Sequence, residues 1–360
     1  MNERLAAEPA KRSLLDPYVF GTLCGLLSAV MYTFSNAFLR AVDRCDPFWV
    51  SGMKAVPTVL CLGPLVAYLA WRGRRLFPSA VSVFGIMGAG LIAQVGGNAS
   101  FQWALGEIGV ALAVPLTLGG MILAAATLGR VFLHEPVTPK VAAALGLLLA
   151  AVCVLSLGAG EARRSVVGDS RAESDATGDA RGSGVDRGGT SSKRELFART
   201  TPDPFPSWRL LAGVFAACFS GLAYSILNVV LRYFLTRGAS LPATLFTVSL
   251  TGAVSLTSIA WWRLGTAELL ATRPMDFGLM LAAGACNTVA FVSLTKSLQL
   301  TSIVYVNALN ATQATLAAIA GVLIFREALS PWLALGIGLT IAGLFALARA
   351  HRGMQGPAEP

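Results

Sequence analysis

Charged residues are scarce in this sequence. Only 13% of its 360 residues are Asp, Glu, Lys or Arg, 55% are hydrophobic, and the mean hydropathy is +0.65. Soluble domains carry roughly 25% charged residues. The scarcity of charge excludes an ordinary soluble protein and indicates an integral membrane protein.

Histidine is also scarce, and cysteine forms no clusters. The two histidines, His134 and His351, both lie at the ends of apolar runs, and His134-Glu135 lacks the second His of an HExxH motif. Ser220 has no Gly-x-Ser-x-Gly frame around it. The six cysteines are scattered without a CxxC pair. We therefore expect neither an enzyme nor a metal or other cofactor.

The net charge of +9 comes without a basic stripe that has interleaved aromatic residues, so we expect no nucleic-acid partner. Most Lys and Arg lie between long apolar runs, where they orient a protein in the bilayer. On the expected cytoplasmic side these charges include Arg72, Arg74 and Arg75. Their distribution predicts a multi-pass protein of the plasma (inner) membrane with both termini in the cytoplasm.

A helix needs about 20 apolar residues to cross a bilayer. The sequence offers ten such runs, near 18–39, 47–71, 79–102, 108–133, 140–159, 208–232, 240–262, 276–298, 302–325 and 331–349. Short turns are expected around Gly106 and Glu107 and around Leu300 and Thr301. Residues 160–207 are rich in Gly, Ser, Asp and Arg, which is typical of a disordered linker. The fold class predicted is all-α, with a tail at 1–17 and another at 351–360.

One segment occurs twice. VMYTFSNAFLR at 30–40 and LAYSILNVVLR at 222–232 lie 192 residues apart, and the same offset pairs Gly21 with Gly213. It also pairs HEPVTPKVAAALG at 134–146 with REALSPWLALGIG at 326–338. Agreement at both ends predicts a duplicated five-helix unit, with repeats at 18–159 and 208–350. Because five is odd, the two copies would cross the membrane in opposite senses, as in many secondary transporters.

With these features the chain resembles the drug/metabolite transporter superfamily, in its EamA-like branch. The resemblance rests on the ten spans, the duplicated halves, and a Glu-x-x-Ser/Thr-x(7)-Gly pattern that begins at Glu135 and at Glu327. The chain has Thr33-Phe34 where many members have Trp-Gly, and Lys54 where many have Arg. The resemblance implies a small-molecule permease, usually an exporter of metabolites, and specifies no substrate.

Polar side chains within the spans are costly and usually face a protein interior or a water-filled cavity. Several recur at helical spacing and form the predicted substrate-binding set: Tyr32, Asn36, Lys54, Gln94, Asn98, Tyr224, Asn228, Asn287, Asn307, Asn310 and Gln313. Three of them form an i, i+3, i+6 ladder in the ninth run, and their neutral amides suit a polar organic solute.

Two interpretations of these residues stay open. Amides and hydroxyls also hold helices together, so each has a packing interpretation beside the binding one. Lys54 can attract an anionic group of a solute, or its amine can extend to the interface. Whether the protein is a transporter or a membrane sensor or scaffold is also open, and solute flux distinguishes them. As a transporter it would be a monomer or homodimer.

No Asp or Glu lies in the middle of an apolar run. Proton-coupled exchangers usually carry such an acid as a relay. We therefore expect facilitated movement or solute exchange by alternating access rather than coupling through a buried carboxylate.

Overall fold

The computed structural model describes residues 16–42, 45–108, 110–134, 137–154, 207–316, 319 and 331–352. Within these residues the secondary structure is helical and contains no β-strand. The predicted all-α class is confirmed. Most of the predicted linker, the outermost residues of both tails, and Glu135 and Glu327 lie outside the described residues.

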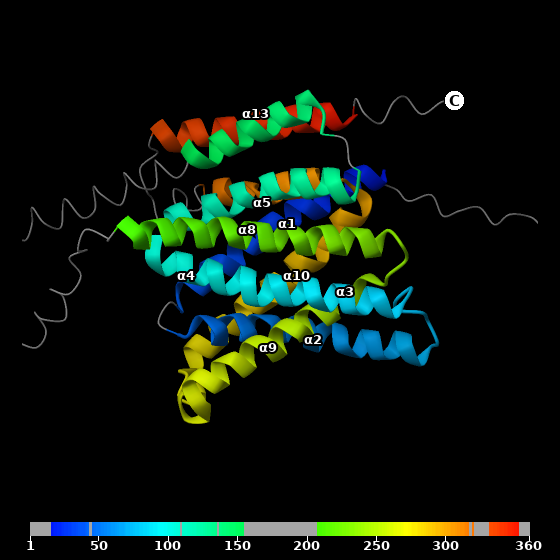
Figure 1. Cartoon of the computed structure of the whole chain (residues 1–360), viewed down its shortest axis with the longest axis vertical. Helices are drawn as coiled ribbons and strands as arrows, with labels where there is room; N and C mark the ends of the chain where they lie inside the picture. The colour runs from blue at the N-terminus through cyan, green and yellow to red at the C-terminus, as the bar shows by residue number, and fades with distance from the viewer. Residues whose placement is uncertain are drawn as a thin grey trace, which may run out of the picture. The chain divides into compact units, whose positions relative to one another are not determined.

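The helices follow the predicted apolar runs closely (Figure 1). Their bounds are α1 Pro17–Arg40, α2 Pro47–Trp71, α3 Ala80–Leu91, the π-helix η1 Ile92–Asn98, α4 Ala99–Ile108, α5 Val110–Phe132, an unlabelled helix Pro139–Val154, α8 Ser207–Leu235, α9 Leu241–Leu270, α10 Pro274–Leu300, α11 Ile303–Asn310 and α13 Pro331–Arg352.

Within the described residues, seven helical stretches are long and apolar enough to span a membrane. Two shorter apolar helices, Pro139–Val154 and Ala334–Leu347, fall in the predicted fifth and tenth runs. The predicted ninth run continues past Leu316 into residues that are not described. The protein is therefore an integral multi-pass membrane protein, and ten spans is an approximate count.

Aspartate and proline together start two of the long helices. Asp16 accepts a hydrogen bond from the Tyr18 amide at 3.0 Å at the start of α1, and Asp46 accepts from the Phe48 and Trp49 amides at the start of α2. The side-chain oxygens satisfy amides that have no partner inside the helix. The following proline has no amide to satisfy, and its fixed φ suits the first turn.

Two parts of the third and fourth runs differ from the prediction. The turn expected at Gly106 and Glu107 is wrong, because α4 continues through both residues to Ile108. The third run is also not one regular helix, because its hydrogen bonding changes to the π type from Ile92 to Asn98. A π-helix bonds i to i+5, and short π segments are frequent at functional sites.

The chain forms two compact units. The first comprises Met1–Ile92, Ala125–Pro136 and Ile226–Gln313. In its described part, α1 packs along α10 and α11, α2 packs along α9 and α10, and α3 packs on α9. Buried side chains between these helices include Ser35, whose hydroxyl donates to the Ala283 carbonyl at 2.9 Å, and Thr58, which bonds Thr288 at 2.8 Å.

The second unit comprises Ala93–Ala124, Val137–Ser225 and Ala314–Pro360. Its core includes Ala104, Ile108, Ala113 and Ala217. Each unit thus combines segments from both sequence halves. The repeats at 18–159 and 208–350 describe an expected duplication of the sequence, and they stay a prediction.

Each unit contains one close helix contact at a glycine, and the residues of the two contacts are related by the 192-residue offset. In the first unit, a Cβ placed at Gly21 would lie 3.0 Å from Leu300 Cβ and 2.7 Å from Thr301 Cγ2. In the second, a Cβ placed at Gly213 would lie 2.5 Å from Ile108 Cγ2. Gly213 is 192 residues from Gly21, and Leu300 is 192 residues from Ile108. Glycines related by the 192-residue offset therefore allow close helix approaches in both units.

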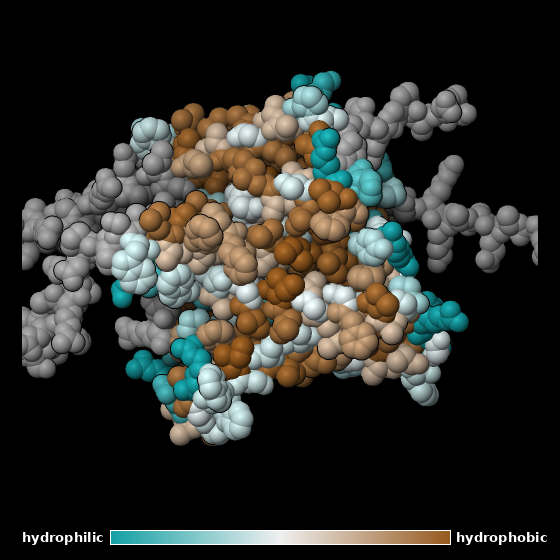
Figure 2. Space-filling view, in the orientation of Figure 1, coloured by the Kyte–Doolittle hydropathy of each residue, from teal (hydrophilic) through white to brown (hydrophobic). Residues whose placement is uncertain are grey.

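Apolar side chains cover much of the face seen in Figure 2. Large apolar side chains with high exposure in the structure include Phe84 on α3, at 72%, and Phe215 on α8, at 80%. Exposure of large apolar side chains on this scale marks a surface that meets another apolar phase. In a membrane protein that phase is the lipid hydrocarbon.

Candidate functional site

The first unit holds a chain of buried amides. Gln313 Nε2 donates a hydrogen bond to Asn310 Oδ1 at 2.7 Å, and Asn36 Nδ2 donates to Gln313 Oε1 at 3.5 Å. Asn36 comes from α1, Asn310 ends α11, and Gln313 lies in the next helical turn. Asn310 and Gln313 are 6% and 8% exposed. The structure therefore joins Asn36 to two members of the predicted ladder.

A second amide pair lies one turn earlier on α11. Asn228 Nδ2, from α8, donates to Asn307 Oδ1 at 2.8 Å. Asn307 has no exposed surface, and its Nδ2 has no hydrogen-bond partner among the described residues. A buried polar atom left unpaired costs roughly 1–3 kcal/mol, so such atoms call for an explanation. This NH₂ group is a donor suited to an acceptor oxygen.

Local breaks position these amides on a short helix. α10 ends at Leu300, Thr301 has extended backbone, and the Ser302 side chain accepts from the Tyr305 amide at 3.3 Å to start α11. α11 then runs for only eight residues, to Asn310. The turn predicted at Leu300 and Thr301 is confirmed. Arg232 of α8 supports it by donating to the Leu298 carbonyl at 2.6 Å and to the Thr301 carbonyl.

The second unit contains a separate polar group on the π-helix. Tyr224 Oη of α8 donates to Asn98 Oδ1 at 2.6 Å, and Asn98 Nδ2 donates to Gln94 Oε1. Gly97 brings the tyrosine close, because a Cβ at Gly97 would lie 3.1 Å from Tyr224 Cε1. The structure thus joins three predicted site residues, and the π-helix supplies two of them.

The other three predicted residues occupy different positions. Tyr32 is half-buried on α1, one turn before Asn36. Lys54 is half-buried on α2, and its backbone carbonyl borders Gly284 of α10, where an added Cβ would lie 2.6 Å from it. Asn287 is half-buried on α10, and no hydrogen bond found among the described residues joins it to either amide group.

Sequence reasoning missed an aromatic contact next to the amides. The rings of Tyr18 and Tyr305 stack with centroids 5.3 Å apart, and Tyr305 Oη lies 3.2 Å from Thr22 Oγ1. These contacts tie the start of α1 to α11. Tyr305 lies two residues before Asn307 in the sequence, but no spacing within the sequence indicates Tyr18 as its partner.

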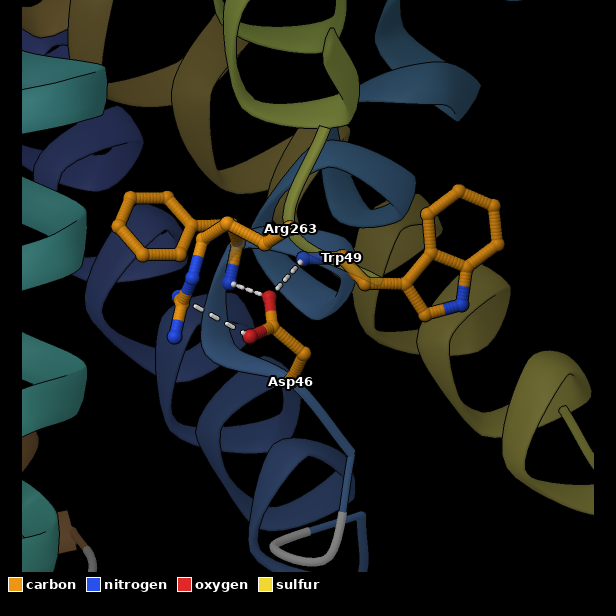
Figure 3. Close-up of polar contacts among 4 residues, drawn as sticks. Asp46, Trp49 and Arg263 are labelled. Atoms are coloured by element: carbon orange, nitrogen blue, oxygen red, sulfur yellow. Dashed lines mark hydrogen bonds and ion pairs between the residues drawn. The ribbon is translucent and has the colours of Figure 1, made fainter. Parts of the chain in front are cut away.

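An ion pair at the start of α2 was also missed. Asp46 Oδ2 lies 3.1 Å from Arg263 Nη1 of α9, while Asp46 Oδ1 caps the helix (Figure 3). The Arg263 guanidinium also lies over the Phe48 ring, 5.0 Å from its centroid. Trp49 Nε1 donates to Thr272 Oγ1 at 3.1 Å, so the first turn of α2 has several contacts with the end of α9. The Asp-Pro pair predicts the cap, but not its partner.

The protein combines apolar spans with buried neutral amides, and comparisons with known proteins bear on what this combination means. Residues 211–349 match the EamA-like transporter family. This match confirms the resemblance drawn from the sequence. EamA-like proteins are transporters, so a membrane transporter, acting on a small-molecule solute in a lipid bilayer, is the class that the comparison supports.

The fold has a counterpart among solved structures. A chain described only as "Crystal structure of protein" is 15% identical, with a TM-score of 0.65 over 93% of this chain and 98% of that one. At this identity the likeness shows the fold alone, and it extends beyond the EamA-like match into the first half. No protein in the curated set matches the sequence.

The site has two chemical properties that bear on its ligand. Its polar atoms are neutral amides and a phenol, which exchange hydrogen bonds without a change of charge. Among the described residues, no three His, Cys, Asp or Glu side chains lie close enough to hold a metal ion. The arrangement suits reversible binding of an uncharged polar group.

Proposed function

We propose that the protein is a permease that exports small polar or amphipathic organic metabolites by alternating access. The match to the EamA-like transporter family supports transport, and the buried amides support a polar solute. In this proposal the two predicted repeats move relative to each other, with both termini in the cytoplasm and the protein in the plasma membrane.

The observation that carries the proposal is the Asn307 amide. Its oxygen is held by Asn228, while its buried Nδ2 has no partner among the described residues. A carbonyl or hydroxyl oxygen of a solute would satisfy it. Asn36, Asn310 and Gln313 belong to the same set of amides and supply further donors and acceptors. Tyr32, Lys54 and Asn287 are proposed to line the same pathway.

A thermal-shift screen against a metabolite panel, followed by counterflow in proteoliposomes, tests this proposal. We expect a solute that stabilises the purified protein and exchanges across the membrane. The Asn307→Ala variant should lose both the shift and most of the counterflow. Gln299→Ala is the matched control, because that amide bonds Lys296 near the end of α10, at 3.1 Å, and should behave as wild type.

The second candidate function is a sensor or scaffold that moves no solute. Its helices would have the same composition as those of a transporter. Flux separates the two: a scaffold gives none with any solute, including those that stabilise the protein. Binding without counterflow would therefore reject the permease and favour a sensor.

We propose further that transport is facilitated or proceeds by exchange. The described helices carry acidic residues only near their ends, as with Glu107, Glu268 and Asp276. Counterflow should respond to a gradient of the partner solute. Uptake driven by an imposed pH gradient, and indifferent to the solute gradient, would reject this mode of coupling.

A further inference from the structure

A shallow apolar groove, wide open to its surroundings, lies on the second unit between α4 and the first half of α8. It has a volume of about 550 Å³ and is lined by Ser100, Trp103, Leu211, Ala212, Phe215, Ala216 and Phe219. Ser100 is the only lining residue with a polar side chain. Trp103, Leu211, Phe215 and Phe219 are 44–80% exposed. None of the amide residues described above, and not Tyr224, is among those lining this groove.

One cation lies on α8 just before the residues that line this groove. Arg209 is exposed in the first turn of α8, and its guanidinium carbon lies 5.6 Å from the centroid of the Trp208 ring. On a helix, Trp208 shares a face with Ala212, Phe215 and Phe219, because these residues follow it by four, seven and eleven positions. The contact with Trp208 therefore holds the Arg209 charge toward the groove face.

The order of these groups along α8 follows the layers of a bilayer. Trp and Arg at a helix end are typical of the interface, where a ring meets the headgroups and a guanidinium binds phosphate. Phe215 and Phe219 follow about two and three turns further along α8, so with Trp208 at the interface their exposed rings would be at the depth of the hydrocarbon. A molecule that matches both parts has an anionic head and a long apolar tail.

We propose that this groove, here called the α4–α8 groove, binds one anionic phospholipid, with an acyl chain along Trp103, Phe215 and Phe219 and the phosphate at Arg209. The site is distinct from the proposed solute pathway and does not depend on transport. A juxtamembrane Arg favours a lipid of net negative charge, such as phosphatidylglycerol, over phosphatidylcholine, whose choline cation offsets the phosphate charge, by roughly fivefold.

Thermal unfolding of the delipidated protein in detergent tests the proposal, with phosphatidylglycerol and phosphatidylcholine of the same acyl chains as probes. Wild type should reach the same stabilisation at a phosphatidylglycerol concentration roughly fivefold lower than the phosphatidylcholine concentration it needs. Arg209→Gln should bind the two lipids equally. Phe215→Ala combined with Phe219→Ala should weaken the binding of both, because the acyl contact is lost.

Arg237→Gln is the matched control. Arg237 is also exposed, lies just past the other end of α8, and lies over an aromatic ring, 3.5 Å from the Tyr233 centroid, but no residue near it lines the α4–α8 groove. This variant should keep the preference for phosphatidylglycerol. Native mass spectrometry of the same proteins, with the two lipids supplied in equal amounts, should show an excess of bound phosphatidylglycerol on wild type and on Arg237→Gln, and equal amounts of the two lipids on Arg209→Gln.

Three results would overturn the inference. The first is equal stabilisation of wild type by the two lipids, which would make the groove ordinary lipid-facing surface. The second is an undiminished preference in Arg209→Gln. The third is full stabilisation by glycerol phosphate alone, which would show a phosphate site without an acyl contact.

Discussion

Asp46 and Arg263 lie 217 residues apart in the sequence, yet the carboxylate and the guanidinium form an ion pair that joins the start of α2 to α9. Asp46 is 10% exposed and Arg263 is 45% exposed. The same carboxylate caps α2 through two amide hydrogen bonds. Asp46 therefore has two structural roles that substitutions can separate.

Asp46→Ala should destabilise the protein more than Arg263→Gln does. Loss of a helix cap costs roughly 1 kcal/mol, whereas a partly exposed ion pair contributes roughly 0–1 kcal/mol. Asp46→Asn keeps a side-chain oxygen for the amides of Phe48 and Trp49 and should resemble Arg263→Gln. Thermal unfolding of the three variants in detergent gives the order of their stabilities. Equal loss in Asp46→Ala and Asp46→Asn would contradict the capping role.

The hydrogen bond between Asn228 and Asn307 predicts that substitutions at these two residues change the free energy of unfolding non-additively. Asn228→Leu leaves Asn307 Oδ1 buried without its donor, which should cost roughly 1–3 kcal/mol. Replacing both residues with Leu removes both polar groups, so the double variant should be more stable than the sum of the single changes predicts. A double-mutant cycle by thermal unfolding gives this coupling. Additive changes would show that the two side chains do not interact in the folded protein.

The related glycine contacts predict parallel effects in the two units. Gly21→Ala and Gly213→Ala should each lower the unfolding temperature, because the added methyl meets Leu300 and Thr301 in one case and Ile108 in the other. Gly88→Ala is the control, since an added Cβ there meets nothing within 4 Å. It should be neutral or slightly stabilising, as Ala is the better helix former. A lower unfolding temperature in only one of the two variants would contradict the equivalence of the two helix contacts.

The predicted orientation has a direct test in the linker. Ser191→Cys, introduced into a variant without the six native cysteines, should react with an impermeant thiol reagent on intact cells, because cytoplasmic termini and five preceding spans place the linker outside. A cysteine added after Pro360 supplies the control and should react only after lysis. Labelling of Ser191→Cys only after lysis would reverse the topology.

The sequence predicted where the helices lie along the chain better than which helices pack against each other. Runs of about 20 apolar residues located most of the helices, because a bilayer fixes the required length. The spacing of Asn307, Asn310 and Gln313 correctly indicated a set of buried amides. Their joining to Asn36 and Asn228 depends on which helices pack together, which no spacing within one helix records. Whether they bind a solute stays a prediction.

Local hydrogen-bond register was the harder property to predict. Gly106 and Glu107 were interpreted as a turn, but one glycine costs a helix only about 1 kcal/mol, and the apolar contacts of Ile108 with Ala104 and Ala217 favour continuation. The π-helix left no periodic signal, because Gln94 and Asn98 keep the i, i+4 spacing that a regular helix also brings together.

The π-helix also sets the rotation of α4 about its own axis. Each residue turns an α-helix by about 100°, so extra residues accommodated by i to i+5 bonding rotate α4 away from the position that a regular helix would give it. Ser100 and Trp103 thereby face α8 across the α4–α8 groove, while Asn98 faces Tyr224. Removing one residue between Ile92 and Asn98 would turn α4 by about a quarter of a revolution and move Ser100 and Trp103 away from the α4–α8 groove. The π-helix thus determines which residues of α4 face α8.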